Sequence, residues 1–89
     1  MHEKALIDDL VRTIESAAQA EGGDRVTRIR VRIGALSHFT DDHFREHFED
    51  AARGTIAAGA TIETELRTDP TEPEAQGVVL EEVDVEVGG

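Results

Sequence analysis

Six residues near the middle of the chain alternate strictly between arginine and a β-branched apolar residue. Successive side chains of a strand point to opposite faces, so Ile29, Val31 and Ile33 share one face and the arginines share the other. This pattern predicts a half-buried strand over 28–33, with Val26 at its entrance. A sheet that buries only one face needs a second layer of structure to cover that face.

Two segments have the spacing of amphipathic helices that can form this layer. Apolar residues recur every three or four positions from Ala5 to Ala20, and two glycines end that segment at 22–23. The second helix is expected to begin after Phe39, with Thr40 as its N-cap and Phe39 packing against Phe44.

Alternation returns over 61–67 and 78–87, and the polar stretch 69–77 between them contains both prolines of the chain. We therefore predict an α/β (α+β) fold: a two-layer sandwich, order αβαββ, with two helices packed on one face of a three-stranded mixed sheet. The 69–77 loop is expected to be exposed. The expected core consists of Leu6, Leu10, Ile14, Ile29, Val31, Ile33, Phe44, Phe48, Ile62 and Leu66.

Composition narrows the functions that such a chain can have. Eighty-nine residues form one domain, spanning 1–89, and a formal charge of −11 disfavours nucleic acid and anionic membranes as partners. The absence of cysteine excludes disulfides, thiolate zinc sites and a cysteine nucleophile. With no apolar segment long enough for a signal peptide or a membrane span, we expect a cytoplasmic protein. No catalytic residue set is recognisable, so we do not expect an enzyme.

Two charged or metal-ligating patterns allow more than one interpretation. The arginine face of 28–33 either pairs with acidic residues of neighbouring strands, which we favour, or contacts an acidic partner. His43 and His47 are four residues apart on one predicted helix face, and with Glu46 they spell the inverted zincin signature. A protease is rejected because no further long helix can supply the third ligand. The pair is then either two surface histidines, which we favour, or an accessory metal site on a face separate from the N-terminus.

The first residues, Met1-His2-Glu3, are a candidate chelate. The amine of Met1, the amide nitrogen of His2 and its imidazole can all reach one metal ion. Deprotonated amides and imidazole in one plane suit square-planar Ni(II) or Cu(II) better than Zn(II) or Mg(II).

Several motifs together resemble the HypA/HybF family of nickel metallochaperones for hydrogenase maturation. They are Met1-His2-Glu3, Ala5-Leu6, Arg25-Val26, the stretch from Val31 to Ser37, Phe44, Phe48, and the glycine-rich segment 54–60. The resemblance covers the chain from Met1 to about Leu66 and returns weakly in the last strand. It implies a nickel-binding domain of two helices on a three-stranded sheet.

The resemblance also implies that Ni(II) is held by the Met1 amine, the His2 side chain and amide, and the Glu3 backbone amide. The family's acidic residue at the entrance to the second helix aligns with Thr40, so Asp41 and His38 are weaker candidate ligands. Family members carry a four-cysteine zinc module where this chain has only 69–77, so no zinc is expected. The chain is either a natural relative that lost the module or one from which it was removed.

Two functions follow. The first is a nickel carrier whose partner is a nickel-enzyme maturation factor or the apo-enzyme. The second is an interaction module of the same fold without physiological metal binding. Exchange of the last strand would allow a homodimer.

Overall fold

The computed structural model describes residues 2–88, and the side chains of residues 4–88. Its elements are the helix α1 (His2–Ala20), strand β1 (Arg25–Ile33), helix α2 (Asp41–Ala52), strand β2 (Thr61–Leu66) and strand β3 (Val78–Glu86). The predicted order αβαββ is confirmed. The main difference in boundaries is that α1 begins at His2, three residues before the predicted start at Ala5.

The three strands form one mixed sheet in the order β2-β1-β3. β1 runs parallel to β2 and antiparallel to β3, and Ile29 lies between Ile62 on one side and Val83 on the other. The parallel pair is joined through α2, because parallel neighbours cannot be joined by a tight hairpin. β1 is therefore the central strand, which explains why its alternation is the strictest in the chain.

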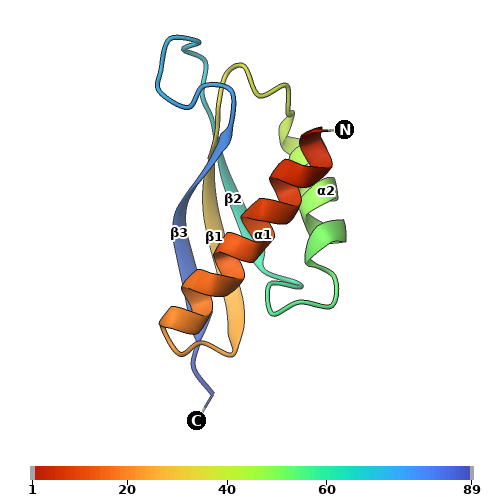
Figure 1. Ribbon diagram of the computed structural model, residues 1–89, viewed down its shortest axis with the longest axis vertical. Coiled ribbons are helices and arrows are strands. Elements are labelled where there is room, and N and C mark those ends of the chain that lie inside the picture. Colours follow the sequence, from red (N-terminus) through yellow and green to blue (C-terminus); the bar gives the residue numbers. More distant parts are fainter. Residues whose placement is uncertain (1, 89) are drawn as a thin grey trace.

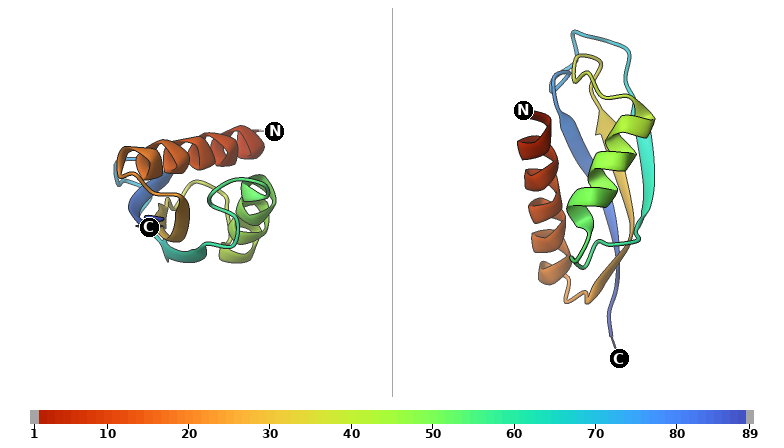
Figure 2. Two further views of the ribbon diagram at one scale, coloured as in Figure 1. Left: turned by 90° about the horizontal axis from the view of Figure 1, so that it is seen from below. Right: turned by 90° about the vertical axis from the view of Figure 1, so that its right-hand side faces the viewer.

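Both helices lie on the same side of the sheet, and α1 crosses it obliquely (Figures 1 and 2). The N-terminal half of α1 lies beside α2, and its C-terminal half covers β3. The two-layer sandwich is thereby confirmed. Between the layers lies one buried core, formed by Ile7, Leu10, Val11, Ile14, Ala18, Val26, Ile29, Val31, Ile33, Phe39, Phe44, Phe48, Ala52, Ala57 and Ile62.

Two residues of the predicted core are not fully buried. Leu6 is only partly buried and packs at the edge of the core, while its neighbour Ile7 is 1% exposed. Leu66 was placed in the core wrongly, since 51% of it is exposed. It is the last residue of β2, an edge strand.

The ends of the helices follow the predicted capping chemistry. Gly22 adopts a positive φ of 72° and the N–H of Gly23 donates to the carbonyl oxygen of Ala18, which closes α1. At the start of α2, the Thr40 hydroxyl oxygen accepts a hydrogen bond from the backbone N–H of His43 at 3.1 Å. The rings of Phe39 and Phe44 meet edge-on with centroids 5.9 Å apart. These contacts set the angle at which α2 leaves the sheet.

The 69–77 loop is less exposed than predicted. Most of it faces solvent, but Ala75 is 7% exposed and packs against the end of β1. The N–H of Gly34 donates to the carbonyl oxygen of Gly77 at 2.9 Å, and the N–H of Leu36 donates to that of Ala75 at 2.7 Å. The loop is therefore a docked segment, because these bonds tie it to the β1–α2 connection.

Candidate metal centre

The predicted nickel ligands are at the N-terminal end of α1. Met1 lies outside the described residues, and so do the side chains of His2 and Glu3. The backbone of His2 and Glu3 forms the beginning of α1. The first N–H groups of a helix have no intrahelical acceptor, and the helix dipole favours negative charge at this end. Deprotonated amide nitrogens are thus better accommodated here than inside a helix.

A groove of about 250 Å³ runs between the first turns of α1 and the second half of α2. Lys4, Ile7 and Asp8 line one side of the groove. His47, Asp50 and Ala51 line the other side. For His47, the expectation of a face separate from the N-terminus is wrong, because α1 crosses the sheet toward α2 and His47 faces its first turns across the groove (Figure 2).

His43 and His47 form a close pair on α2. Their ring centroids are 4.4 Å apart and their planes are inclined at 69°. Both residues are half-buried, and the His43 ring also packs against Phe39 at 5.7 Å. Two neighbours thus restrict the orientation of the His43 ring.

The two weaker candidate ligands lie near the start of α2. His38 is exposed in the β1–α2 connection and has a positive φ of 67°. The Asp41 carboxylate accepts a hydrogen bond from the Thr64 hydroxyl and another from Arg45 Nε at 3.0 Å. These two donors, Thr64 above all, hold the pKa of Asp41 below its ordinary value against the opposing effect of burial. Asp41 thus ties α2 to β2, and its role as a ligand stays a prediction.

No group of three or more histidine or acidic residues suited to a metal ion occurs within the described part of the chain. No described helix has both the length and the apolar character needed to cross a membrane.

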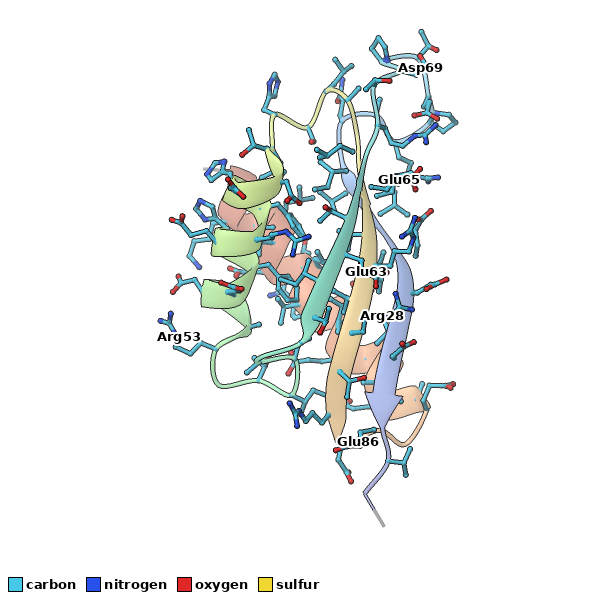
Figure 3. The ribbon with its side chains drawn as sticks, turned by 180° about the vertical axis from the view of Figure 1, so that it is seen from behind. Arg28, Arg53, Glu63, Glu65, Asp69 and Glu86 are labelled. Atoms are coloured by element: carbon cyan, nitrogen blue, oxygen red, sulfur yellow. The ribbon has the colours of Figure 1, made fainter. Side chains whose placement is uncertain are left out.

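The arginine face of β1 is the other surface that the sequence singled out. Arg28 donates to Glu63 at 2.6 Å, and these two side chains can be located in Figure 3. It also donates to Asp84 at 2.8 Å and to Glu82 at 2.6 Å. These carboxylates, Asp84 first, raise the pKa of Arg28 above its ordinary value. The next arginine, Arg30, makes looser ion pairs at 3.6 and 3.7 Å. The favoured interpretation is confirmed: these arginines pair with acidic residues of the neighbouring strands.

Sequence reasoning missed the groove between the helices and the docking of the 69–77 loop. Lys4 and Asp8, whose charged groups lie 3.0 Å apart, form an i,i+4 ion pair along one side of that groove. The angle between two helices depends on side-chain packing, which residue spacing alone does not determine. For the docking of the 69–77 loop, the available sequence signal was Gly34, because a glycine lets another backbone segment approach closely.

Comparison with protein families gives a match over nearly the whole chain. Residues 1–88 match the model of a family described as "Hydrogenase/urease nickel incorporation, metallochaperone, hypA".

Curated relatives match over a shorter stretch. The hydrogenase maturation factor HypA of Thermococcus kodakarensis is 46% identical over 63 residues, which are 71% of this chain and 45% of that protein. HypA of Methylocella silvestris is 38% identical over 66 residues, covering 74% of this chain and 58% of the relative. The chain thus spans about half the length of the curated relatives that it matches.

A solved structure agrees in fold. The solution structure of the Ni metallochaperone HypA from Helicobacter pylori superposes with a TM-score of 0.79. The match covers 97% of this chain and 98% of that one, at 12% sequence identity. At this identity the likeness establishes the fold alone.

Proposed function

This chain belongs to the HypA family, and from that membership we propose that it binds Ni(II) at its N-terminus and delivers it during maturation of a nickel enzyme such as nickel–iron hydrogenase. One observation carries the proposal: the sequence Met1-His2-Glu3 stands directly at the start of α1. The partner would be a maturation factor or the apo-enzyme. Nickel is the cargo, and no zinc is required.

The proposed ligands are the Met1 amine, the His2 imidazole and amide, and the Glu3 amide. Amine and amide nitrogens of consecutive residues close small chelate rings that favour a planar arrangement, and Ni(II) accepts that geometry. The start of α1 supports this ligand set because its first amides carry no intrahelical hydrogen bond. In the second turn of α1, deprotonation of an amide would remove the donor of a backbone hydrogen bond of the helix.

The same ligands explain how a carrier can release its metal. Binding removes protons from two amides and from the amine, so affinity must rise with pH. Reprotonation of these nitrogens reverses binding without any change in the folded core. The end of a helix at the surface is also accessible to a partner, which a core site would not be.

The second candidate is an interaction module of the same fold without physiological metal binding. The observation that favours it is the 69–77 segment, which stands where family members carry a cysteine zinc module and contains no cysteine or histidine. If nickel affinity is absent from the untagged protein, this second function replaces the first.

Calorimetric titration of Ni(II) into the untagged protein tests the proposal. Three glycines added before Met1 convert its amine into an amide and move His2 away from the new terminal amine, and His2→Ala removes the imidazole. Both changes should weaken the tight nickel equivalent strongly, since each removes one ligand from the chelate. Three glycines added after Gly89 are the matched control and should have no effect.

The competing explanation is adventitious binding by scattered histidines. It predicts that the N-terminal glycines are harmless and that substitutions on α2 remove all binding. A glycine-extended protein that binds its tight nickel equivalent as strongly as the native protein contradicts the proposal.

A further inference from the structure

Strand β3 forms one edge of the sheet, and its outer side is open. Within the described residues no segment pairs with that side, since the sheet has the order β2-β1-β3 (Figure 1). In an antiparallel pair, alternate residues direct their N–H and C=O groups away from the partner strand. Alternate backbone groups of β3 therefore point away from β1, and a row of such groups is a template for pairing with another chain.

One β-bulge interrupts this edge. Glu81 has no partner residue on β1, whereas each residue from Glu82 to Glu86 has one. A bulge hinders pairing at the part of an edge where it lies. The part of β3 after the bulge is therefore the regular stretch at which an added strand can pair.

The last turns of α1 lie over β3, and a groove runs between them (Figures 1 and 2). The groove has a volume of about 420 Å³ and is lined by Ala17, Ala20 and Glu21 of α1 and by Leu80, Glu81, Glu82, Val83 and Val85 of β3. The small alanine side chains leave space above the aliphatic side chains of β3, which are only partly buried. This groove can therefore receive apolar side chains of an added strand.

The opposite face of the same stretch is acidic. Glu82 and Asp84 share the guanidinium of Arg28, and their side chains are 54% and 52% exposed. Glu86 follows on this face and is exposed as well (Figure 3). One cation thus serves two carboxylates, so negative charge remains at the edge. On its inner side β3 already pairs with β1, in which arginines alternate with apolar residues, and a strand of the same chemistry would complement the outer side.

A second copy of this chain is a poor occupant of the edge. Pairing β3 with β3 of another copy would place Glu82, Asp84 and Glu86 near the same acids of the partner strand, and like charges on facing strands are destabilising. The formal charge of −11 on each copy adds a general repulsion. Charge therefore favours a basic partner of a different sequence.

We propose that the outer edge of β3 binds an extended segment of a partner protein in which basic and apolar residues alternate. The segment adds to the sheet as a fourth strand, with its basic side chains beside Glu82, Asp84 and Glu86 and its apolar side chains in the groove. Ala20 and His2 are the two ends of α1, roughly 27 Å apart along the helix. The proposed interaction thus uses no residue of the N-terminal chelate and is independent of the function proposed above.

A capped peptide, acetyl-Gly-Arg-Val-Arg-Val-Arg-Val-Gly-amide, is the probe, and it is titrated into the isotope-labelled protein. NMR records the shifts of the backbone amide signals and the rates of amide hydrogen exchange. A second peptide, acetyl-Gly-Arg-Arg-Arg-Val-Val-Val-Gly-amide, has the same composition and charge without the alternation. It is the control for attraction by charge alone, because its basic side chains do not share one face of a strand.

The alternating peptide should shift the signals of 82–87 and of the last turn of α1, and it should slow hydrogen exchange at alternate residues of β3. Ala20→Arg should weaken binding on the order of tenfold, because the new side chain occupies the groove and repels the basic peptide. Ala20 is exposed, so the core is left intact. Ala58→Arg is the matched control: it adds the same charge at an exposed alanine near Ile62 of β2, the opposite edge strand, and should bind like the native protein.

Several outcomes would overturn the proposal. Equal affinity for the two peptides would mean attraction by charge alone, and shifts confined to β2 or to α2 would place the binding surface elsewhere. Equal weakening by the two arginine substitutions would show that the groove takes no part. Failure of the alternating peptide to bind at millimolar concentration would also contradict the proposal. So would a dimer of the protein alone with slowly exchanging β3 amides, because a second copy would then occupy the edge.

Discussion

Adding one methyl group at Gly34 tests how the 69–77 loop is held against the end of β1. A β-carbon built at this position would lie 2.2 Å from the carbonyl oxygen of Ala75 and 2.5 Å from its carbonyl carbon. Both are backbone atoms, so no side chain can rotate out of the way. The Gly34→Ala variant must either accept strain in the packed loop or release the loop from β1.

Both responses have a cost that the structure bounds. Forcing an extra methyl group into closely packed space costs about 1–3 kcal/mol. Releasing the loop breaks the bonds from Gly34 to Gly77 and from Leu36 to Ala75, at about 0.5–1.5 kcal/mol each. It also exposes the Ala75 methyl group, worth roughly 0.8 kcal/mol. We therefore expect Gly34→Ala to lower the free energy of unfolding by about 2–3 kcal/mol.

Urea unfolding followed by circular dichroism measures this change, with Gly77→Ala as the matched control. A β-carbon at Gly77 would meet only the carbonyl oxygen of Glu74, at 3.9 Å, which is an ordinary contact. That substitution should be neutral, or stabilising by roughly 0.4–1 kcal/mol through the unfolded chain. Equal stability of the two variants would refute the close packing of loop and strand.

Three further substitutions test the core and the tie between α2 and β2. Phe48→Ala should lower the free energy of unfolding by about 3–5 kcal/mol in urea titration, because its ring is 1% exposed; a loss under about 1 kcal/mol would contradict its central place. Leu66→Ala should cost no more than about 1 kcal/mol in the same assay, since half of the residue already faces solvent, and a larger loss would mean that it is buried. Asp41→Asn should be less stable than the native protein at neutral pH, with the difference shrinking as pH falls below about 4. The difference has this direction because the pKa of Asp41 is lowered in the folded state, so the stabilisation by the ionised carboxylate is lost when it is protonated. A stability difference that does not change with pH would contradict this role of Asp41.

The fold was largely predictable because its strongest signals are local. Strict alternation marked β1, and a cap with its aromatic contact marked the start of α2. Leu66 was misplaced because alternation assigns a residue to a face but does not say how far the helices cover that face. The start of α1 was placed too late because no capping residue precedes His2.

The candidate site was predictable only where its residues are adjacent in sequence. Met1-His2-Glu3 can be proposed as a chelate without a structure because consecutive backbone atoms would form its rings. The proximity of His47 to Lys4 could not be identified in this way, since it depends on the angle at which α1 crosses α2. The burial of Ala75 likewise depends on contacts with Gly34, which lies 41 residues earlier in the chain.

The number of protons released on nickel binding tests the N-terminal chelate most directly. Titration of Ni(II) into the untagged protein at pH 7.5, repeated in buffers of different ionisation enthalpy, yields this number. Two amides each lose a whole proton, and the terminal amine, with an ordinary pKa of about 7.7–8.0, loses most of another. The proposed ligands therefore predict a release of roughly two to three protons for the tight equivalent. A release below one proton, the value for binding by imidazoles alone, would contradict nickel binding by the N-terminus.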